Sequence, residues 1–150
     1  MDPPYIKIES GTKKSIIDYI SLCSKEDSIP NTNKEKSEKP KISIIIPIHN
    51  EEKNIIPTIR SIQNQTLKEI EIICINDNCS DNSFNILEKL KKEDPRIILI
   101  TNKIQRGILY NIINSAIEAK GEYIAYIYIK DFLSNNDVLK NLYEISTKKY

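Results

Sequence analysis

Hydrophobic and polar residues alternate in blocks along most of this chain, and the blocks predict strands separated by helices. The clearest block is Lys41–Glu52 (KISIIIPIHNEE), an apolar run followed by a proline, a polar turn and an acidic pair. This order is typical of a buried strand that ends at a turn and leads into a helix. We expect the strand at Ile42–Pro47, and the chain after it repeats the strand–turn–helix order.

Three further apolar blocks predict strands at Ile70–Ile75, Ile97–Ile100 and Tyr123–Ile129. The last block is apolar throughout, which is typical of a strand buried on both faces, so we expect it near the centre of the sheet. Helices are predicted from about Asn54 to Asn64 with Pro57 in the first turn, from Ser80 or Asp81 to Lys92, over Leu109–Ala119, and from Asn136. Gly121 follows the third helix, where a left-handed C-terminal residue is expected.

Strands that alternate with helices of this length make a parallel sheet with helices on both faces. Residues 41–150 are therefore predicted to form a three-layer, Rossmann-like α/β sandwich with a mostly parallel sheet of about four strands. Residues 1–40 are predicted to be an N-terminal extension, with a short helix at 13–24 and a charged linker at 25–40. Ligands of open α/β sheets bind beyond the carboxyl ends of strands, so the turn after Pro47 is the expected place of a site.

The charge balance and the cysteines narrow the class of protein. The 22 basic and 21 acidic residues give a net charge of +1, without the basic excess of a nucleic-acid-binding protein, so no nucleic-acid partner is expected. The 32 isoleucines supply most apolar positions, and β-branched side chains favour strands. The three cysteines include no CxxC motif, and Cys74 lies in an apolar run, which favours a buried thiol and a reducing compartment.

The sequence contains no apolar stretch long enough for a transmembrane helix. Its first ten residues, MDPPYIKIES, lack the basic and apolar regions of a signal peptide. We therefore expect the protein in the cytoplasm or at the cytosolic face of a membrane.

Four stretches, in this order and spacing, resemble glycosyltransferase family 2, whose members have the GT-A fold. They are ISIIIPIHNEE (42–52), SIQNQTLKEIEIICINDNCSDNS (61–83), DPRIILI (94–100) and AKGEYIAY (119–126). The resemblance spans residues 41–139 and implies the half of the fold that binds a nucleotide sugar, with UDP-type donors expected. The acceptor half has no match in the chain, which ends soon after the fourth predicted strand. Members transfer a sugar, so an active protein would be a hexosyltransferase.

The resemblance also implies roles for single residues. The residues expected around the nucleobase and ribose are Pro47, Ile48, His49 and Glu51. Most members carry Tyr where this chain has His49; an imidazole can still stack on a base, or His49 is only a turn residue. The acidic pair that follows the second strand in the family corresponds to Asn76-Asp77, so Asp77 is the expected hydrogen-bonding partner of the base.

The end of the fourth predicted strand departs from the family pattern. The resemblance implies an Asp-x-Asp-Asp motif that holds Mg²⁺ or Mn²⁺, but Tyr128 and Lys130 replace the expected acidic ligands and only Asp131 remains as a weak metal ligand. Two interpretations of Lys130 remain open. Its ammonium group replaces the metal at the diphosphate, or the motif has decayed and Lys130 pairs with Asp131 or faces water. Arg106 could reach the diphosphate from its loop, or be solvated there.

Two functions therefore remain open. One is a family 2-like glycosyltransferase that uses a nucleoside-diphosphate sugar. The alternative is a non-catalytic nucleotide-sugar-binding or partner-binding module, since an incomplete sheet can expose an edge that a protein partner covers. A dinucleotide-binding or receiver-like domain is disfavoured, because the chain has no GxGxxG motif and only 3 glycines.

Overall fold

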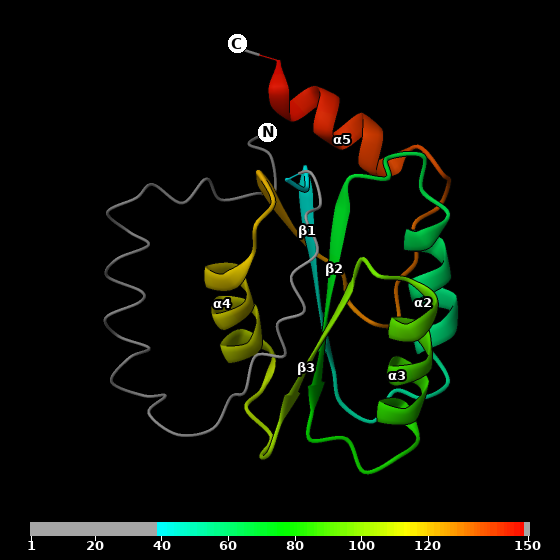
Figure 1. Ribbon diagram of the computed structural model, residues 1–150, viewed down its shortest axis with the longest axis vertical. Helices are drawn as coiled ribbons and strands as arrows, with labels where there is room; N and C mark the ends of the chain where they lie inside the picture. The colour runs from blue at the N-terminus through cyan, green and yellow to red at the C-terminus, as the bar shows by residue number, and fades with distance from the viewer. Residues whose placement is uncertain (1–38, 149–150) are drawn as a thin grey trace.

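The computed structural model describes residues 39–148, in which strands and helices alternate (Figure 1). The strands are β1 (Ile42–Ile48), β2 (Ile70–Asp77), β3 (Ile97–Asn102) and β4 (Tyr123–Tyr126). The helices are α2 (Ile55–Gln63), α3 (Ser83–Glu93), α4 (Ile108–Glu118) and α5 (Val138–Thr147). The predicted helix at 13–24 and nearly all of the predicted linker lie outside the described residues.

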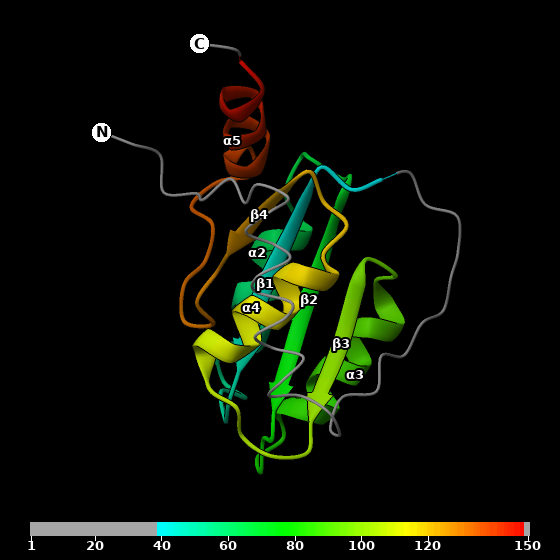
Figure 2. The same ribbon diagram turned by 90° about the vertical axis from the view of Figure 1, so that its left-hand side faces the viewer.

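Within that range the strands form one parallel sheet in the order β3-β2-β1-β4. Helices α2 and α3 cover one face and α4 covers the other (Figure 1), which confirms the predicted three-layer sandwich. The chain winds from β1 outward to β3, then returns across the opposite face to β4 beside β1 (Figure 2). The order of the strands reverses between β1 and β4, and such a switch point is where open α/β sheets bind ligands.

Isoleucine side chains form the core on both faces of the sheet. The larger cluster lies under α2 and α3 and includes Ile44, Ile46, Ile48, Ile55, Ile59, Ile62, Ile72, Leu87 and Leu90. The smaller cluster lies under α4 and is formed by Ile45, Ile73 and Ile75 with Ile112 and Ala116. Cys74 is fully buried, as predicted, and this burial raises the pKa of its thiol to about 12.

The helix starts follow the prediction closely. Asn54 is the N-cap residue of α2 and Pro57 lies in the first turn, where its missing N–H removes no helical hydrogen bond. Asn82 is the N-cap residue of α3, one position later than predicted. Asp81 still caps this helix, because its Oδ1 accepts a hydrogen bond from the Ser83 backbone N–H at 2.9 Å.

Strand β4 differs from the prediction in both length and place. It lies at the edge of the sheet, and its pairing with β1 ends at Ile45 and Tyr126 instead of continuing to Ile129. The backbone N–H groups of Tyr123 and Ile127 donate to the carbonyl oxygens of Lys41 and Ile45. The backbone N–H and C=O groups of the odd-numbered β1 residues therefore point toward β4. The next donor in that series would be residue 47, and Pro47 has no N–H. The chain therefore leaves the sheet after Tyr126.

Gly121 is required for space and not for a left-handed backbone, which corrects the prediction. Among the described residues only Asn50, Asn78 and Gly107 have positive φ. A Cβ atom at position 121 would lie 2.5 Å from the backbone nitrogen of Ser43. The turn between α4 and β4 therefore packs directly on the start of β1.

Helix α5 lies at the end of the sheet where β1 begins, opposite the carboxyl edge (Figure 1). The Tyr143 ring packs edge-on against the Tyr123 ring, with ring centroids 5.9 Å apart. The Lys41 ammonium lies 5.2 Å from the centroid of the Tyr143 ring. The apolar side chains of α5 are only partly covered, since Leu142 and Ile145 remain 41% and 46% exposed.

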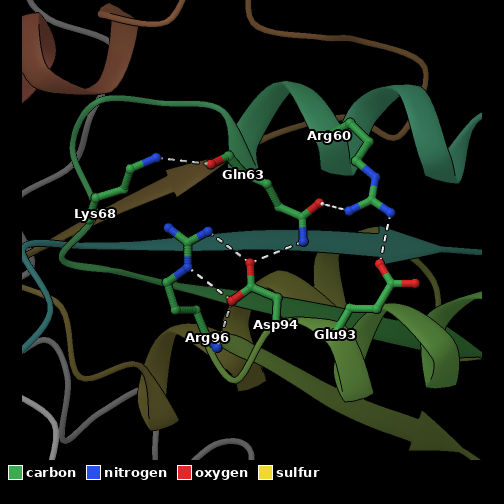
Figure 3. A network of polar contacts seen from close by, with 6 residues as sticks. All are labelled: Arg60, Gln63, Lys68, Glu93, Asp94 and Arg96. Atoms are coloured by element: carbon green, nitrogen blue, oxygen red, sulfur yellow. Dashed lines mark hydrogen bonds and ion pairs between the residues drawn. The ribbon is translucent and has the colours of Figure 1, made fainter.

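A polar network ties the end of α2 to the connection between α3 and β3 (Figure 3). The Asp94 carboxylate accepts hydrogen bonds from Arg96 at 2.8 Å and from Gln63 at 3.0 Å. Burial acts to raise the pKa of Asp94, but these donors and the Arg96 charge outweigh it and hold the pKa below its ordinary value. The network lies before the start of β3, away from the carboxyl edge of the sheet. We therefore interpret it as a structural contact between α2 and the α3–β3 connection.

Candidate functional site

The loops that follow β1 and β2 are joined by hydrogen bonds from their own side chains. Asn50 and Asn78 both adopt left-handed φ angles, which Asn tolerates better than most residues. The Asn50 Oδ1 atom accepts a hydrogen bond from the Ser80 backbone N–H at 2.8 Å. The Asp81 carboxylate accepts another from the Glu52 backbone N–H at 3.1 Å. The two loops therefore form one wall at the carboxyl edge of the sheet.

The imidazole of His49 is fixed against the end of β2. Its Nδ1 lies 2.7 Å from the backbone carbonyl oxygen of Asp77, and because a carbonyl only accepts, Nδ1 is the donor. The two residues before it are buried: Pro47 and Ile48 both belong to β1, and Ile48 has no exposed surface. Ile48 therefore offers a ligand no surface in this conformation, and the expected contact of these two residues with a base stays a prediction.

Asp77 ends β2, and the residue is only 3% exposed. It accepts hydrogen bonds at 2.8 Å from the Asn102 side chain and from the backbone N–H groups of Arg106 and Gly107. Burial acts to raise the pKa of Asp77, but these donors outweigh it and hold the pKa below its ordinary value. The Asn111 side chain acts on the pKa in the same direction, so donors of the protein itself surround this carboxylate.

Asn102 and Asn111 belong to this site although the sequence patterns did not single them out. Asn102 ends β3 directly opposite Asp77 in the sheet register. Its side-chain amide also donates to Asn111 Oδ1 on α4 at 2.7 Å, which ties the ends of β2 and β3 to the helix. The signal available in the sequence was a polar residue that closes an apolar strand, whereas Asp77 was expected from the family resemblance.

Arg106 contributes to the site first through its backbone. Its N–H donates to Asp77, and its guanidinium carbon lies 5.3 Å from the centroid of the Tyr110 ring. The expected contact between this side chain and a diphosphate stays a prediction.

An ion pair spans the switch point between β1 and β4. Lys130 Nζ lies 3.3 Å from Glu51 Oε1, and the second oxygen of Glu51 accepts a hydrogen bond from Asn54 Nδ2 at 2.7 Å. The Glu51 side chain is 18% exposed and the Lys130 side chain 54%. Lys130 thus pairs with Glu51 in the loop after β1, a partner that neither interpretation of the sequence named, and its side chain is also half exposed to water.

Side chains of α2 hold the segment that carries Lys130. Thr58 Oγ1 lies 2.6 Å from the Ile129 carbonyl oxygen and 2.7 Å from that of Asp131, within donating distance of both. Ile129 is itself buried, with 1% of its surface exposed. Thr58 therefore anchors the backbone beside Lys130, while the lysine side chain is half exposed.

The residues at positions 128–131 do not fit a divalent cation. Mg²⁺ and Mn²⁺ prefer several carboxylate oxygens, and this segment offers the single exposed carboxylate of Asp131 beside a lysine ammonium group. Along residues 39–148 no group of three or more His, Cys, Asp or Glu side chains could hold a metal ion.

None of the helices described for residues 39–148 has the length and apolar character needed to span a bilayer. This finding concerns the helices only and leaves the expected cytosolic location as a prediction.

The sequence and the structure were each compared with known proteins, and both comparisons find similarity to glycosyltransferases. The model of the family described as Glycosyl transferase family 2 matches residues 43–144. The chain is similar to a poly(ribitol-phosphate) β-glucosyltransferase of Bacillus spizizenii, with 36% identity over 67% of this chain and 16% of that protein. It is also similar to a UDP-Glc:α-D-GlcNAc-diphosphoundecaprenol β-1,3-glucosyltransferase of Escherichia coli, with 35% identity over 72% of this chain and 42% of that protein.

Two solved structures share the fold. One is the mannosyltransferase PcManGT from Pyrobaculum calidifontis in complex with GDP-Man and Mn²⁺, with a TM-score of 0.68 and 15% identity, covering 91% of this chain and 39% of that one. The other is the 1–349 portion of S. aureus TarS, with a TM-score of 0.61 and 26% identity, covering 68% of this chain and 31% of that one.

The chain spans less than half the length of each of these relatives. The matched residues nevertheless include all four strands of the described sheet and most of the helices between and after them. By the extent of this match, the chain belongs to glycosyl transferase family 2.

Proposed function

We propose that the carboxyl edge of the sheet binds a nucleoside-diphosphate sugar of the UDP type, the donor of a hexosyl transfer. The observation that carries this proposal is the Glu51–Lys130 ion pair at the switch point between β1 and β4. The ion pair lies where an open α/β sheet receives its ligand, and the buried Asp77 ends the neighbouring strand β2. In this arrangement the loops after β1 and β2 take the base and ribose, and the segment after β4 takes the diphosphate.

The related proteins support the UDP-type donor. The Escherichia coli relative is named for UDP-glucose, and S. aureus TarS has been solved with UDP and with UDP-GlcNAc. The same relative acts on a diphosphoundecaprenol acceptor by name. We accordingly expect a lipid-linked acceptor at the cytosolic face of a membrane for this protein.

The test is an NMR titration of the 150-residue chain, labelled with ¹⁵N, with UDP and with GDP. The largest amide shifts are expected at His49, Asn78, Gly107 and Lys130. Amides at the opposite edge, such as those of Gln63 and Lys120, should not move. Shifts confined to that opposite edge, or no shifts up to millimolar nucleotide, would contradict the proposal.

A second candidate is a donor-binding module without catalysis. It is favoured by Tyr128 and Lys130, which leave Asp131 as the only carboxylate of the segment that would hold a metal. The two candidates differ in turnover, measured as UDP released from UDP-glucose in the presence of lipid-diphosphate acceptors. Binding without release supports the module, and sustained release supports the transferase.

A further inference from the structure

We propose that Lys130 takes the place of the divalent cation in this protein and binds the diphosphate of the donor directly. The inference rests on the proposed nucleotide-sugar site. It starts from a disagreement: the mannosyltransferase that shares this fold was solved with GDP-Man and Mn²⁺, whereas the residues at 128–131 of this chain do not fit a metal ion.

The position of the ammonium group supports this role. Lys130 lies in the segment that leaves the sheet after Tyr126, and its Nζ reaches back to Glu51 at the end of β1. That reach brings a positive charge to the switch point between β1 and β4, where a bound diphosphate would lie. A lysine binds phosphate oxygens as a point charge and needs no second ligand to do so.

The surroundings leave the ammonium group available to a ligand. Thr58 anchors the backbone carbonyls of Ile129 and Asp131, so the backbone of Lys130 is held in position before a ligand binds. The side chain itself is 54% exposed, and its partner is a single carboxylate at 3.3 Å. Glu51 is held separately by Asn54, so the lysine can turn from this carboxylate to a diphosphate without disturbing the loop. A diphosphate carries more negative charge than one carboxylate and competes effectively for the ammonium.

The experiment is calorimetric titration of the full chain with UDP and with uridine, each in EDTA and in Mn²⁺. The wild-type chain is expected to bind UDP with the same affinity in both conditions. Lys130→Ala should weaken UDP binding by about 10- to 100-fold, which is the range of a charge-assisted hydrogen bond, and leave uridine binding unchanged. Lys130→Arg should retain most of the UDP affinity, because a guanidinium also binds phosphate.

Lys140→Ala is the matched control, since this exposed lysine lies on α5 at the opposite end of the sheet. UDP binding that requires Mn²⁺ would overturn the lysine proposal and leave the nucleotide site standing. Equal losses of UDP and uridine affinity in Lys130→Ala would also overturn it, because a diphosphate contact cannot affect uridine. Absence of UDP binding in every condition would overturn the nucleotide site together with this inference.

Discussion

Ser43 and Glu71 lie opposite each other on β1 and β2, and the Ser43 hydroxyl donates to Glu71 Oε1 at 2.6 Å. Both side chains are buried inside the sheet. The same Glu71 oxygen accepts the Lys120 backbone N–H at 2.6 Å, and Ser43 Oγ accepts that of Gly121 at 2.8 Å. This buried polar group fastens the turn before β4 to the two central strands, which fixes where β4 enters the sheet.

Gly121→Ala is expected to destabilise the protein by about 1–3 kcal/mol, the range of an overpacked site. The new Cβ would lie 2.5 Å from the Ser43 backbone nitrogen, and a backbone atom cannot move aside as a flexible side chain can. The measurement is the free energy of unfolding in urea. Lys120→Ala is the control, because it changes the exposed neighbouring side chain and keeps the N–H that Glu71 accepts. Equal stability of the two variants would contradict the steric account.

Asp77→Asn is expected to remove a part of the stability that depends on pH. The pKa of Asp77 is held low in the folded protein, so its contribution is fully present above the unfolded pKa of about 4. It is lost as the pH falls through the lower folded pKa. The difference in free energy of unfolding between wild type and Asp77→Asn should therefore be largest near neutral pH and shrink below about pH 4.

Urea denaturation at several pH values between neutral and acidic tests this prediction. Asp94→Asn provides a comparison at the opposite edge of the sheet, where the pKa of Asp94 is also held below its ordinary value. A difference between wild type and Asp77→Asn that stays constant with pH would show that the Asp77 charge contributes nothing specific.

The sequence predicts the order and kind of the elements because isoleucine runs and helical spacing are local signals. The buried face of α2 (Ile55, Ile59 and Ile62) follows from this spacing alone. The length of β4 does not, because it depends on a missing donor at Pro47, a residue distant in the chain that becomes a neighbour only in the sheet. The role of Gly121 could not be predicted for the same reason, because the space that it needs is limited by Ser43, which is distant in the sequence.

The candidate site was predictable only in part. The apolar runs predict where the strands end, and the family resemblance implied the roles of His49, Glu51 and Asp77. The hydrogen bond between Asp77 and Asn102 depends on the register of β2 with β3, and the ion pair of Glu51 with Lys130 depends on β4 lying beside β1. Pairings of this kind are tertiary, so no local pattern reports them.

Thr58→Val is expected to loosen the segment that carries Lys130. Valine keeps the shape of threonine and removes the hydroxyl that lies within 2.7 Å of two carbonyl oxygens, at Ile129 and Asp131. We expect a loss of about 1–2 kcal/mol in the free energy of unfolding. We also expect weaker binding of UDP with unchanged binding of uridine, measured by calorimetry. Thr58→Ser keeps the hydroxyl and is the control. A destabilised variant with unchanged UDP affinity would show that this anchor does not position Lys130.

The double variant Tyr128→Asp/Lys130→Asp is expected to convert the site to metal dependence. With Asp131 it places three carboxylates in the segment where the family resemblance implies a metal motif, and carboxylate oxygens are the ligands that Mn²⁺ prefers. Calorimetry should then detect UDP binding in Mn²⁺ and none in EDTA, because the added negative charge repels the diphosphate unless a cation lies between them. Tyr128→Asn/Lys130→Asn is the control, since it removes the same two side chains without supplying carboxylates and should not respond to Mn²⁺. If the aspartate variant binds UDP equally well in EDTA, the diphosphate does not lie beside residues 128–131, and the role of Lys130 as a replacement for the metal is wrong.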